Sequence, residues 1–161
     1  LSDAAHFITD AYHSGFFEYV SMIYSPNLRG YNSLKTQVIA ESLGKNRASL
    51  MPYPAEGPED EHAQAERFLG GMQNKFYDLI IIREQSDIGS NLQELNYAQF
   101  KNICDIVQQS NARMRVIEID YSLKALGYLT QSMLLETLLV AQILEINPLG
   151  QPNVERLKSQ F

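Results

Sequence analysis

Three side chains that can transfer protons interrupt the apolar faces of predicted helices. Glu41 shares one helical face with Leu34 and Val38, because these residues follow one another at intervals of four and three positions. His62 lies at the edge of a second apolar stripe, and Lys158 lies one helical turn after an apolar residue. A carboxylate, an imidazole and an ammonium group are the groups that proton-transfer chemistry uses when burial and neighbouring charges adjust their pKa values. These residues are therefore candidates for a proton-transfer site.

Each candidate also has an ordinary structural explanation. Glu41 and Lys45 are four residues apart in the orientation that favours an ion pair on an exposed helix. His62 directly follows the acidic segment 59–61, so it is equally a partly solvated histidine in the first turn of a helix. Lys158 lies near the end of the chain, where a lysine commonly extends its ammonium group into solvent. Taken one by one, the residues leave both interpretations open.

Short runs of strand-forming residues alternate with longer amphipathic segments. Segment 77–84 contains the continuous apolar run LIII, which is typical of a buried strand in a parallel sheet. We expect it to pair in parallel with strands at 18–24 and 113–119, with helices on both faces of the sheet. Two prolines restrict 49–55 to an edge strand or an extended loop. Helical spacing is found in 32–45, about 57–71, 97–110, 122–147 and about 152–160. The second of these helices, which ends at Gly71 or just beyond, would carry Ala65, Phe68, Leu69 and Met72 on its apolar face.

This alternation predicts an α/β fold with a mainly parallel sheet. In such folds ligands bind outside the carboxyl ends of the strands. We therefore expect the functional loops to be those that follow Tyr24, Ala55, Glu84 and Asp120.

Composition limits the class of protein. The 161 residues, 45% of them hydrophobic, are enough for one domain, which we expect to cover 1–161. A net charge of −6 disfavours a nucleic-acid partner, and the apolar runs are too short to cross a membrane. A lone cysteine, Cys104, excludes an internal disulfide and a cysteine-rich metal site, which favours a reducing, cytoplasmic location. No zinc, phosphate-loop or dinucleotide motif occurs, so no metal or cofactor is expected.

Three segments together resemble motifs of the phosphoglucose isomerase family. AESLGK (40–45), GPEDEHAQ (57–64) and INPLGQPNVERLK (146–158) resemble A-E-S-x-G-K, G-x-x-D-Q-H-S-Q and I-N-P-F-D-Q-P-G-V-E-x-x-K of bacterial members. Their order and spacing also agree, over a stretch from about Tyr19 to Lys158. No single motif is specific, but three in the right order make a chance resemblance implausible.

The resemblance implies a three-layer αβα sandwich, the sugar-isomerase domain, and a set of roles. Glu41 stands where the family has the base that abstracts a proton from C2 or C1 of the sugar, through a cis-enediol. His62 stands at the ring-opening histidine, Lys158 at the lysine that assists this step, and Gln151 at a glutamine that contacts substrate. The implied reaction is the aldose–ketose isomerisation of glucose 6-phosphate and fructose 6-phosphate, which needs no metal or cofactor.

The chain also departs from the family. Gly150 replaces an aspartate, Asn153 replaces a glycine and Glu61 replaces the glutamine beside the histidine. The resemblance is to the C-terminal half alone, so the loop that binds the sugar phosphate and an arginine of the N-terminal domain are missing. The family also forms homodimers, in which the histidine reaches the neighbouring subunit's site.

Two hypotheses remain from the sequence. The first is that the chain, which begins at Leu1 rather than methionine, is the C-terminal catalytic half of a glucose-6-phosphate isomerase. The alternative is a non-catalytic phosphosugar-binding or regulatory module. The joint presence of Glu41, His62, Gln151 and Lys158 favours the first, because a binding module has no need of three groups that transfer protons.

Overall fold

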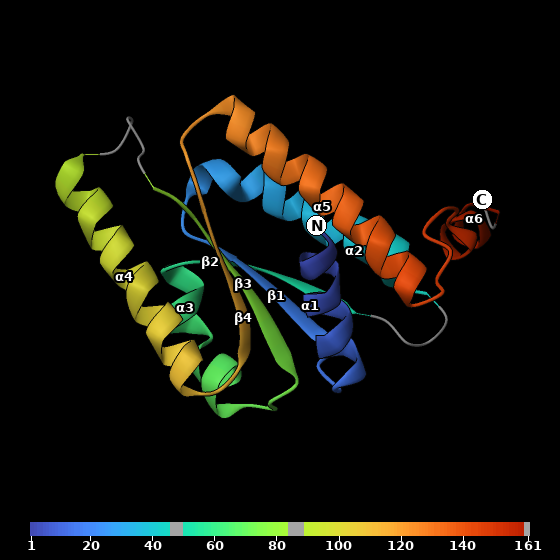
Figure 1. The fold of residues 1–161 in the computed structure, drawn as a ribbon, viewed down its shortest axis with the longest axis horizontal. Helices are drawn as coiled ribbons and strands as arrows, with labels where there is room; N and C mark the ends of the chain where they lie inside the picture. The colour runs from blue at the N-terminus through green and yellow to red at the C-terminus, as the bar shows by residue number, and fades with distance from the viewer. Residues whose placement is uncertain (46–49, 84–88, 160–161) are drawn as a thin grey trace.

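The chain forms one layered α/β structure around a parallel sheet (Figure 1). The structure, a computed structural model, describes residues 1–45, 50–83 and 89–159. Across these residues the sheet has four strands in the order β2-β1-β3-β4, all parallel. The strands are β1 (Glu18–Ile23), β2 (Met51–Glu56), β3 (Lys75–Ile82) and β4 (Arg113–Ile119). The predicted parallel pairing of the first, third and fourth strands is confirmed.

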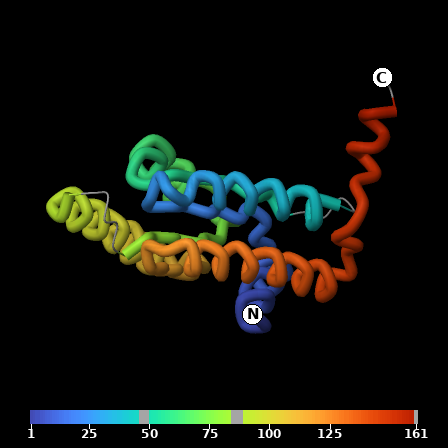
Figure 2. Tube along the Cα trace, turned by 90° about the horizontal axis from the view of Figure 1, so that it is seen from above, coloured from blue at the N-terminus to red at the C-terminus, as the bar shows by residue number. Residues whose placement is uncertain are grey.

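Helices cover both faces of this sheet (Figures 1 and 2). The helices are α1 (Ser2–His13), α2 (Arg29–Leu43), α3 (Glu59–Ala63), α4 (Ser90–Gln109), α5 (Leu123–Ile143) and α6 (Pro152–Lys158), with a 3-10 turn η1 (Pro26–Leu28) and a π-helix η2 (Glu66–Gly70). One face packs against α1, α2 and α5, through residues such as Ile8, Ile39 and Val140. The other packs against η2 and α4, through Phe68 and Phe100. The predicted three-layer αβα sandwich is confirmed.

Strand position in the sheet explains the sequence of each strand. β1 and β3 are buried along their whole length, because helices cover both of their faces. β2 is an edge strand, which tolerates the missing amide hydrogens of Pro52 and Pro54. The edge strand expected in 49–55 is therefore present from Met51, while residue 49 and Glu84 lie outside the described residues.

Two helices differ from the expectation. The helix expected over 57–71 is divided, because α3 ends at Ala63 and a π-helix follows from Glu66. Met72, expected on its apolar face, lies beyond both helices and is 75% exposed. The N-terminal helix α1 was not expected, although Ala5, Ile8 and Ala11 repeat every three residues and all three are buried.

A buried ionic network ties the helices to the sheet. The carboxylate of Asp78, in the middle of β3, accepts hydrogen bonds from Lys35 of α2, from Tyr19 and from Arg115. Arg115 makes two of these bonds, at 2.8 and 2.7 Å, and also donates to Glu136 of α5. Burial raises the pKa of Asp78, but the two cations outweigh it and hold that pKa well below its ordinary value. The network therefore fixes α2 and α5 relative to β3.

No helix of the described residues is long and apolar enough to cross a membrane.

Candidate functional site

Glu41 and Gln151 are brought together, although they lie 110 residues apart in the chain. Glu41 is in the last turn of α2, and Gln151 immediately precedes α6. The side-chain amide of Gln151 donates a hydrogen bond of 2.6 Å to Oε2 of Glu41. Gln37, one turn earlier on α2, donates a bond of 2.9 Å to Oε1. Both carboxylate oxygens of this half-buried glutamate are thus held by amide donors, which fixes the plane of the carboxylate.

Lys45 does not form the helix-surface pair with Glu41 that the spacing allowed. Its ammonium group donates instead to the backbone carbonyl of Asn147, at 2.7 Å, and to that of Leu149, at 3.2 Å. No ion pair joins Lys45 to Glu41, and both residues lie in the described part of the chain. The charge of Lys45 is therefore directed at the segment between α5 and α6.

That segment is folded tightly by its own residues. The side-chain oxygen of Asn147 accepts a hydrogen bond of 3.0 Å from the amide of Leu149, which is a turn typical of asparagine. Gly150 has a φ of 75°, a left-handed conformation that glycine adopts without strain. Glycine, which replaces the family's aspartate at position 150, therefore fits the left-handed backbone conformation found there. Gln151 follows directly, and Pro152 lies in the first turn of α6.

His62 lies at the other end of the sheet from Glu41. It is exposed on α3 and lines a pocket of about 310 Å³ with residues of α3, η2 and α4. The neighbouring carboxylate of Glu61 accepts a hydrogen bond of 2.7 Å from the hydroxyl of Tyr24, at the carboxyl end of β1. In the described residues no hydrogen bond or ion pair joins His62 to Glu61.

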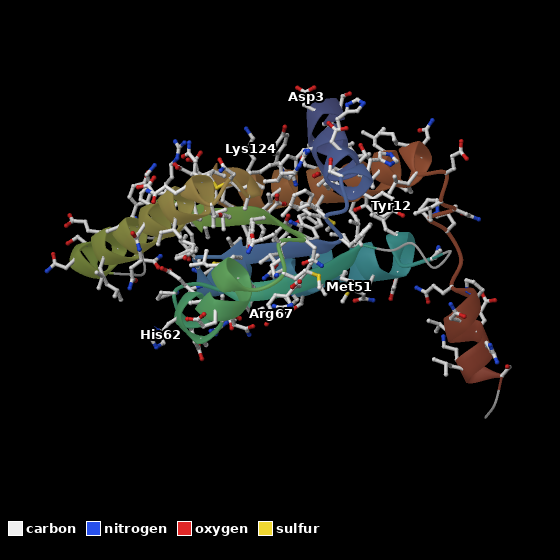
Figure 3. All side chains as sticks on the ribbon, turned by 90° about the horizontal axis from the view of Figure 1, so that it is seen from below. Asp3, Tyr12, Met51, His62, Arg67 and Lys124 are labelled. Carbon is white, nitrogen blue, oxygen red and sulfur yellow. The ribbon has the colours of Figure 1, made fainter. Side chains whose placement is uncertain are left out.

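Chain direction explains why Glu41 and His62 are separated. α2 runs back from the carboxyl end of β1, so its last turn and Glu41 lie at the amino edge of the sheet. β2 then carries the chain to the carboxyl edge over six residues, about 20 Å, and His62 follows it. In Figure 3 the labelled Met51, which begins β2, and the labelled His62 lie well apart. The two side chains do not meet within this chain.

Lys158 is also not brought to Glu41. It is the exposed last residue of α6, a seven-residue helix that projects away from the rest of the molecule (Figures 2 and 3). Leu157 beside it is 62% exposed, so the apolar side of α6 is largely uncovered. Of the four predicted residues, the structure joins Glu41 with Gln151 and leaves His62 and Lys158 apart from them.

The four candidate residues do not all lie at the carboxyl ends of the strands, where the functional loops were expected. His62 follows the carboxyl end of β2, but Glu41 and Gln151 lie at the amino edge, because both helices that lead to them run antiparallel to the strands. A pocket of about 910 Å³ lies beside β4 and α5, and none of the four residues lines it. Its lining includes Asp78, Arg115 and Glu136, whose side chains already bond one another in the buried network.

Two residues at this amino edge were not among the predicted site residues. Gln37 donates a hydrogen bond to the carboxylate of Glu41, and Lys45 donates to the backbone of the loop between α5 and α6. Lys45 belongs to the AESLGK segment, so the motif contained the signal, but its spacing from Glu41 suggested a surface pair. No cluster of three or more histidine, cysteine or acidic side chains suited to a metal ion occurs in residues 1–45, 50–83 and 89–159.

Comparisons with known proteins give a consistent relationship. No model of a known protein family matches the chain. Glucose-6-phosphate isomerase of Rubrobacter xylanophilus is 29% identical over 156 residues, covering 84% of this chain and 36% of the relative. The glucose-6-phosphate isomerase of Thermus thermophilus is 28% identical over 159 residues, covering 85% of this chain and 38% of the relative. That of Campylobacter jejuni is 30% identical over 177 residues, covering 96% of this chain and 43% of the relative. The chain thus spans about two fifths of the length of these relatives.

The fold agrees with a solved structure. The crystal structure of hypothetical protein TT0462 from Thermus thermophilus superposes with a TM-score of 0.82 and 25% identity, over 97% of this chain and 42% of that one. The sequence relatives cover most of the same chain. The resemblance that the three motifs indicated is therefore confirmed, and this chain is a relative of the glucose-6-phosphate isomerases over most of its length.

Proposed function

We propose that this chain is the C-terminal, catalytic half of an enzyme that interconverts glucose 6-phosphate and fructose 6-phosphate, a reaction of glycolysis and gluconeogenesis. The observation that carries the proposal is the hydrogen bond between Gln151 and Glu41. The motifs assigned one residue to substrate contact and the other to proton abstraction, from opposite ends of the chain. Their meeting at 2.6 Å is what a shared site requires.

In the proposed reaction Glu41 is the carbon base. Its carboxylate removes the proton from C2 of the open-chain aldose while the C1 carbonyl oxygen gains a proton, which gives the cis-enediol. Glu41 then returns a proton to C1 as the C2 hydroxyl loses its own, which leaves the ketose. The amide donors of Gln37 and Gln151 hold the carboxylate in one orientation, so little reorganisation is needed for proton transfer.

His62 and Lys158 serve the ring-opening step in this proposal. Because His62 lies at the opposite edge of the sheet, it would act at the Glu41 site of a second copy, and the enzyme would be a homodimer. Lys158 would approach the site when α6, which projects from this chain, packs against the rest of the enzyme.

The sugar phosphate needs a separate site. A dianionic phosphate is bound by backbone amides, hydroxyls or cations. In the segments that the structure describes, the cation nearest to Glu41 in the chain, Lys45, is engaged by carbonyl groups. We therefore assign phosphate binding to an N-terminal sugar-isomerase domain, with 1–161 as a single second domain of a cytoplasmic enzyme.

A chimera tests the proposed function. This chain would replace the matching region of the Thermus thermophilus isomerase, and fructose 6-phosphate formation would be followed in a coupled assay. We expect activity that Glu41→Gln abolishes and that a change of the exposed Lys101 leaves intact. A folded chimera that binds glucose 6-phosphate without turning it over would instead favour a non-catalytic phosphosugar-binding module.

A further inference from the structure

We infer that Lys45 is a positioning residue, which locks the loop between α5 and α6 against α2 and thereby sets Gln151 against Glu41. The inference rests on the proposed function for its catalytic meaning. Its structural part, that Lys45 is needed for the contact between Gln151 and Glu41, stands without it.

The path of the chain after α2 directs Lys45 to this loop. The amide of Gly44 bonds to the carbonyl of Ala40 at 3.1 Å and closes the last turn of α2. A Cβ atom on Gly44 would lie 2.3 Å from that carbonyl oxygen, so only glycine allows the chain to leave the helix so closely. Lys45 is therefore held directly beside the end of α2, four residues after Glu41.

The ammonium group of Lys45 joins two segments that are distant in sequence. Its bonds to the carbonyl oxygens of Asn147 and Leu149 span 102 and 104 residues of chain. Both are charge-assisted, which makes them stronger than bonds between neutral groups. The side chain of Asn147 also accepts a bond from the amide of Leu149, so Lys45 ties a loop that is closed by its own hydrogen bond to the end of α2.

Gln151 depends on that link. It lies two residues after Leu149, beyond Gly150, whose left-handed backbone gives the chain its final turn. α6, on the other side of Gln151, projects from the molecule and offers no support of its own (Figure 2). Gln37, by contrast, lies on the same helix as Glu41 and is independent of the loop. Loss of Lys45 should thus remove one of the two donors to Glu41 and keep the other.

The test compares Lys45→Met with Lys45→Arg in the purified 161-residue chain by NMR. In the parent chain we expect nuclear Overhauser effects from the side-chain amide protons of both Gln37 and Gln151 to Glu41. Lys45→Met should lose the nuclear Overhauser effect between Gln151 and Glu41 and keep the one between Gln37 and Glu41. Lys45→Arg can still donate to the carbonyl groups, so it should retain most of the effect between Gln151 and Glu41. Lys101→Met, an exposed lysine of α4, is the matched control and should change neither. A Gln151 effect that survives in Lys45→Met would overturn the inference.

Turnover in the chimera gives a second measurement. Misplacement of a catalytic group by about 1 Å can cost about 100-fold in rate, so we expect Lys45→Met to lower kcat by about 10- to 100-fold, with Lys45→Arg recovering most of it. An unchanged kcat would refute a positioning role. The two measurements test the two claims separately. If Lys45→Met loses the nuclear Overhauser effect between Gln151 and Glu41 while Glu41→Gln keeps full activity, Lys45 positions Gln151 but Glu41 is not the base.

Discussion

Glu41 and His62 lie at opposite edges of one parallel sheet, the first at the amino edge and the second beyond the carboxyl end of β2. Between them the chain runs the length of β2, six residues or about 20 Å, from one end of the sheet to the other. No rotation of either side chain spans this distance. The proposed function, which uses both residues, therefore places them in a site shared by two copies of the chain.

Subunit complementation follows from this separation. In the active chimera, Glu41→Gln and His62→Ala should each be inactive in the isomerisation of the ring-form sugar, because that reaction needs both ring opening and proton abstraction. When the two variants are unfolded together and refolded in equal amounts, half of the dimers carry one intact site, so we expect about one quarter of the parent activity. The measurement is turnover of the refolded mixture, with each variant refolded alone as the control. A mixture as inactive as its components would show that the residues do not share a site between subunits.

The isolated chain should show negligible isomerase turnover. Binding energy from the phosphate end of the substrate normally orients the reacting carbons, and the proposal places that end in another domain. A steady-state coupled assay of the purified 161-residue chain measures this, with circular dichroism as the control that the chain is folded. Turnover comparable with that of the chimera would contradict the proposed division between two domains.

The buried network predicts a large stability loss in Asp78→Asn. The change leaves Lys35 and Arg115 without the carboxylate that they share, and breaking a buried ion pair costs about 3–5 kcal/mol. Urea denaturation monitored by circular dichroism gives the free energy of unfolding. Asp105→Asn, an exposed carboxylate on α4, is the matched control and should change it by about 0.5 kcal/mol or less.

The same network has a defined pH dependence. Asp78 has a lowered pKa in the folded chain, so its contribution to stability is present above the unfolded value of about 3.9 and is lost as the pH falls below it. Glu136 acts in the opposite sense, because burial raises its pKa. We therefore expect the parent chain to lose more unfolding free energy than Asp78→Asn between about pH 5 and pH 3. Equal losses would mean that Asp78 is not the titrating group.

Cys104 should react slowly with alkylating reagents. The side chain is buried between α4 and the sheet, and burial raises the pKa of its thiol to about 11. Since the thiolate is the reactive form, iodoacetamide labelling near neutral pH should be slow in the folded chain and fast in urea. Mass spectrometry follows the modification over time. Equal rates in both states would show that the helix does not shield the thiol.

The sequence predicted the sheet well because its signals are local. The apolar run of β3 and the prolines of β2 each restrict a strand to one kind of place, centre or edge. Local signals could not predict the contact between Glu41 and Gln151, because periodicity describes one helix at a time and this contact joins residues 110 positions apart. Lys45 shows the same limit: its spacing from Glu41 suggested a pair on one helix, but the carbonyl groups of a distant loop bind it instead.

The division of the helix after β2 was also beyond local signals. The apolar positions around Phe68 satisfy an α-helical pattern, yet the chain changes to a π-helix at Glu66. In that arrangement Phe68 is buried against the sheet and Arg67 reaches Glu18 at the start of β1. Tertiary contacts of this kind override helix propensity, which is a weak preference by comparison.

Glu41→Gln is the sharpest test of the assigned chemistry. The change keeps the size of the side chain, but glutamine cannot take a proton from carbon. Turnover of the chimera should fall by about 100-fold or more, the scale of losing a general base, while substrate affinity changes little. If Glu41 had only a structural role at the end of α2, the change would cost about 0.5 kcal/mol of stability and leave the rate unaltered.

Isotope exchange distinguishes proton abstraction from every other cause of a slow rate. A substrate deuterated at C2 loses its label to solvent water only when a base removes it and exchanges before returning it. Glu41→Gln should lose this exchange, whereas His62→Ala should retain it when the open-chain sugar is supplied, because ring opening is then bypassed. The oxygen of the new amide can accept from Gln37 or Gln151, and the other of these two can turn its amide to accept from the new NH2, so the variant is expected to keep its place in the site and lose only the proton acceptor. Normal exchange in Glu41→Gln would assign the abstraction to another residue.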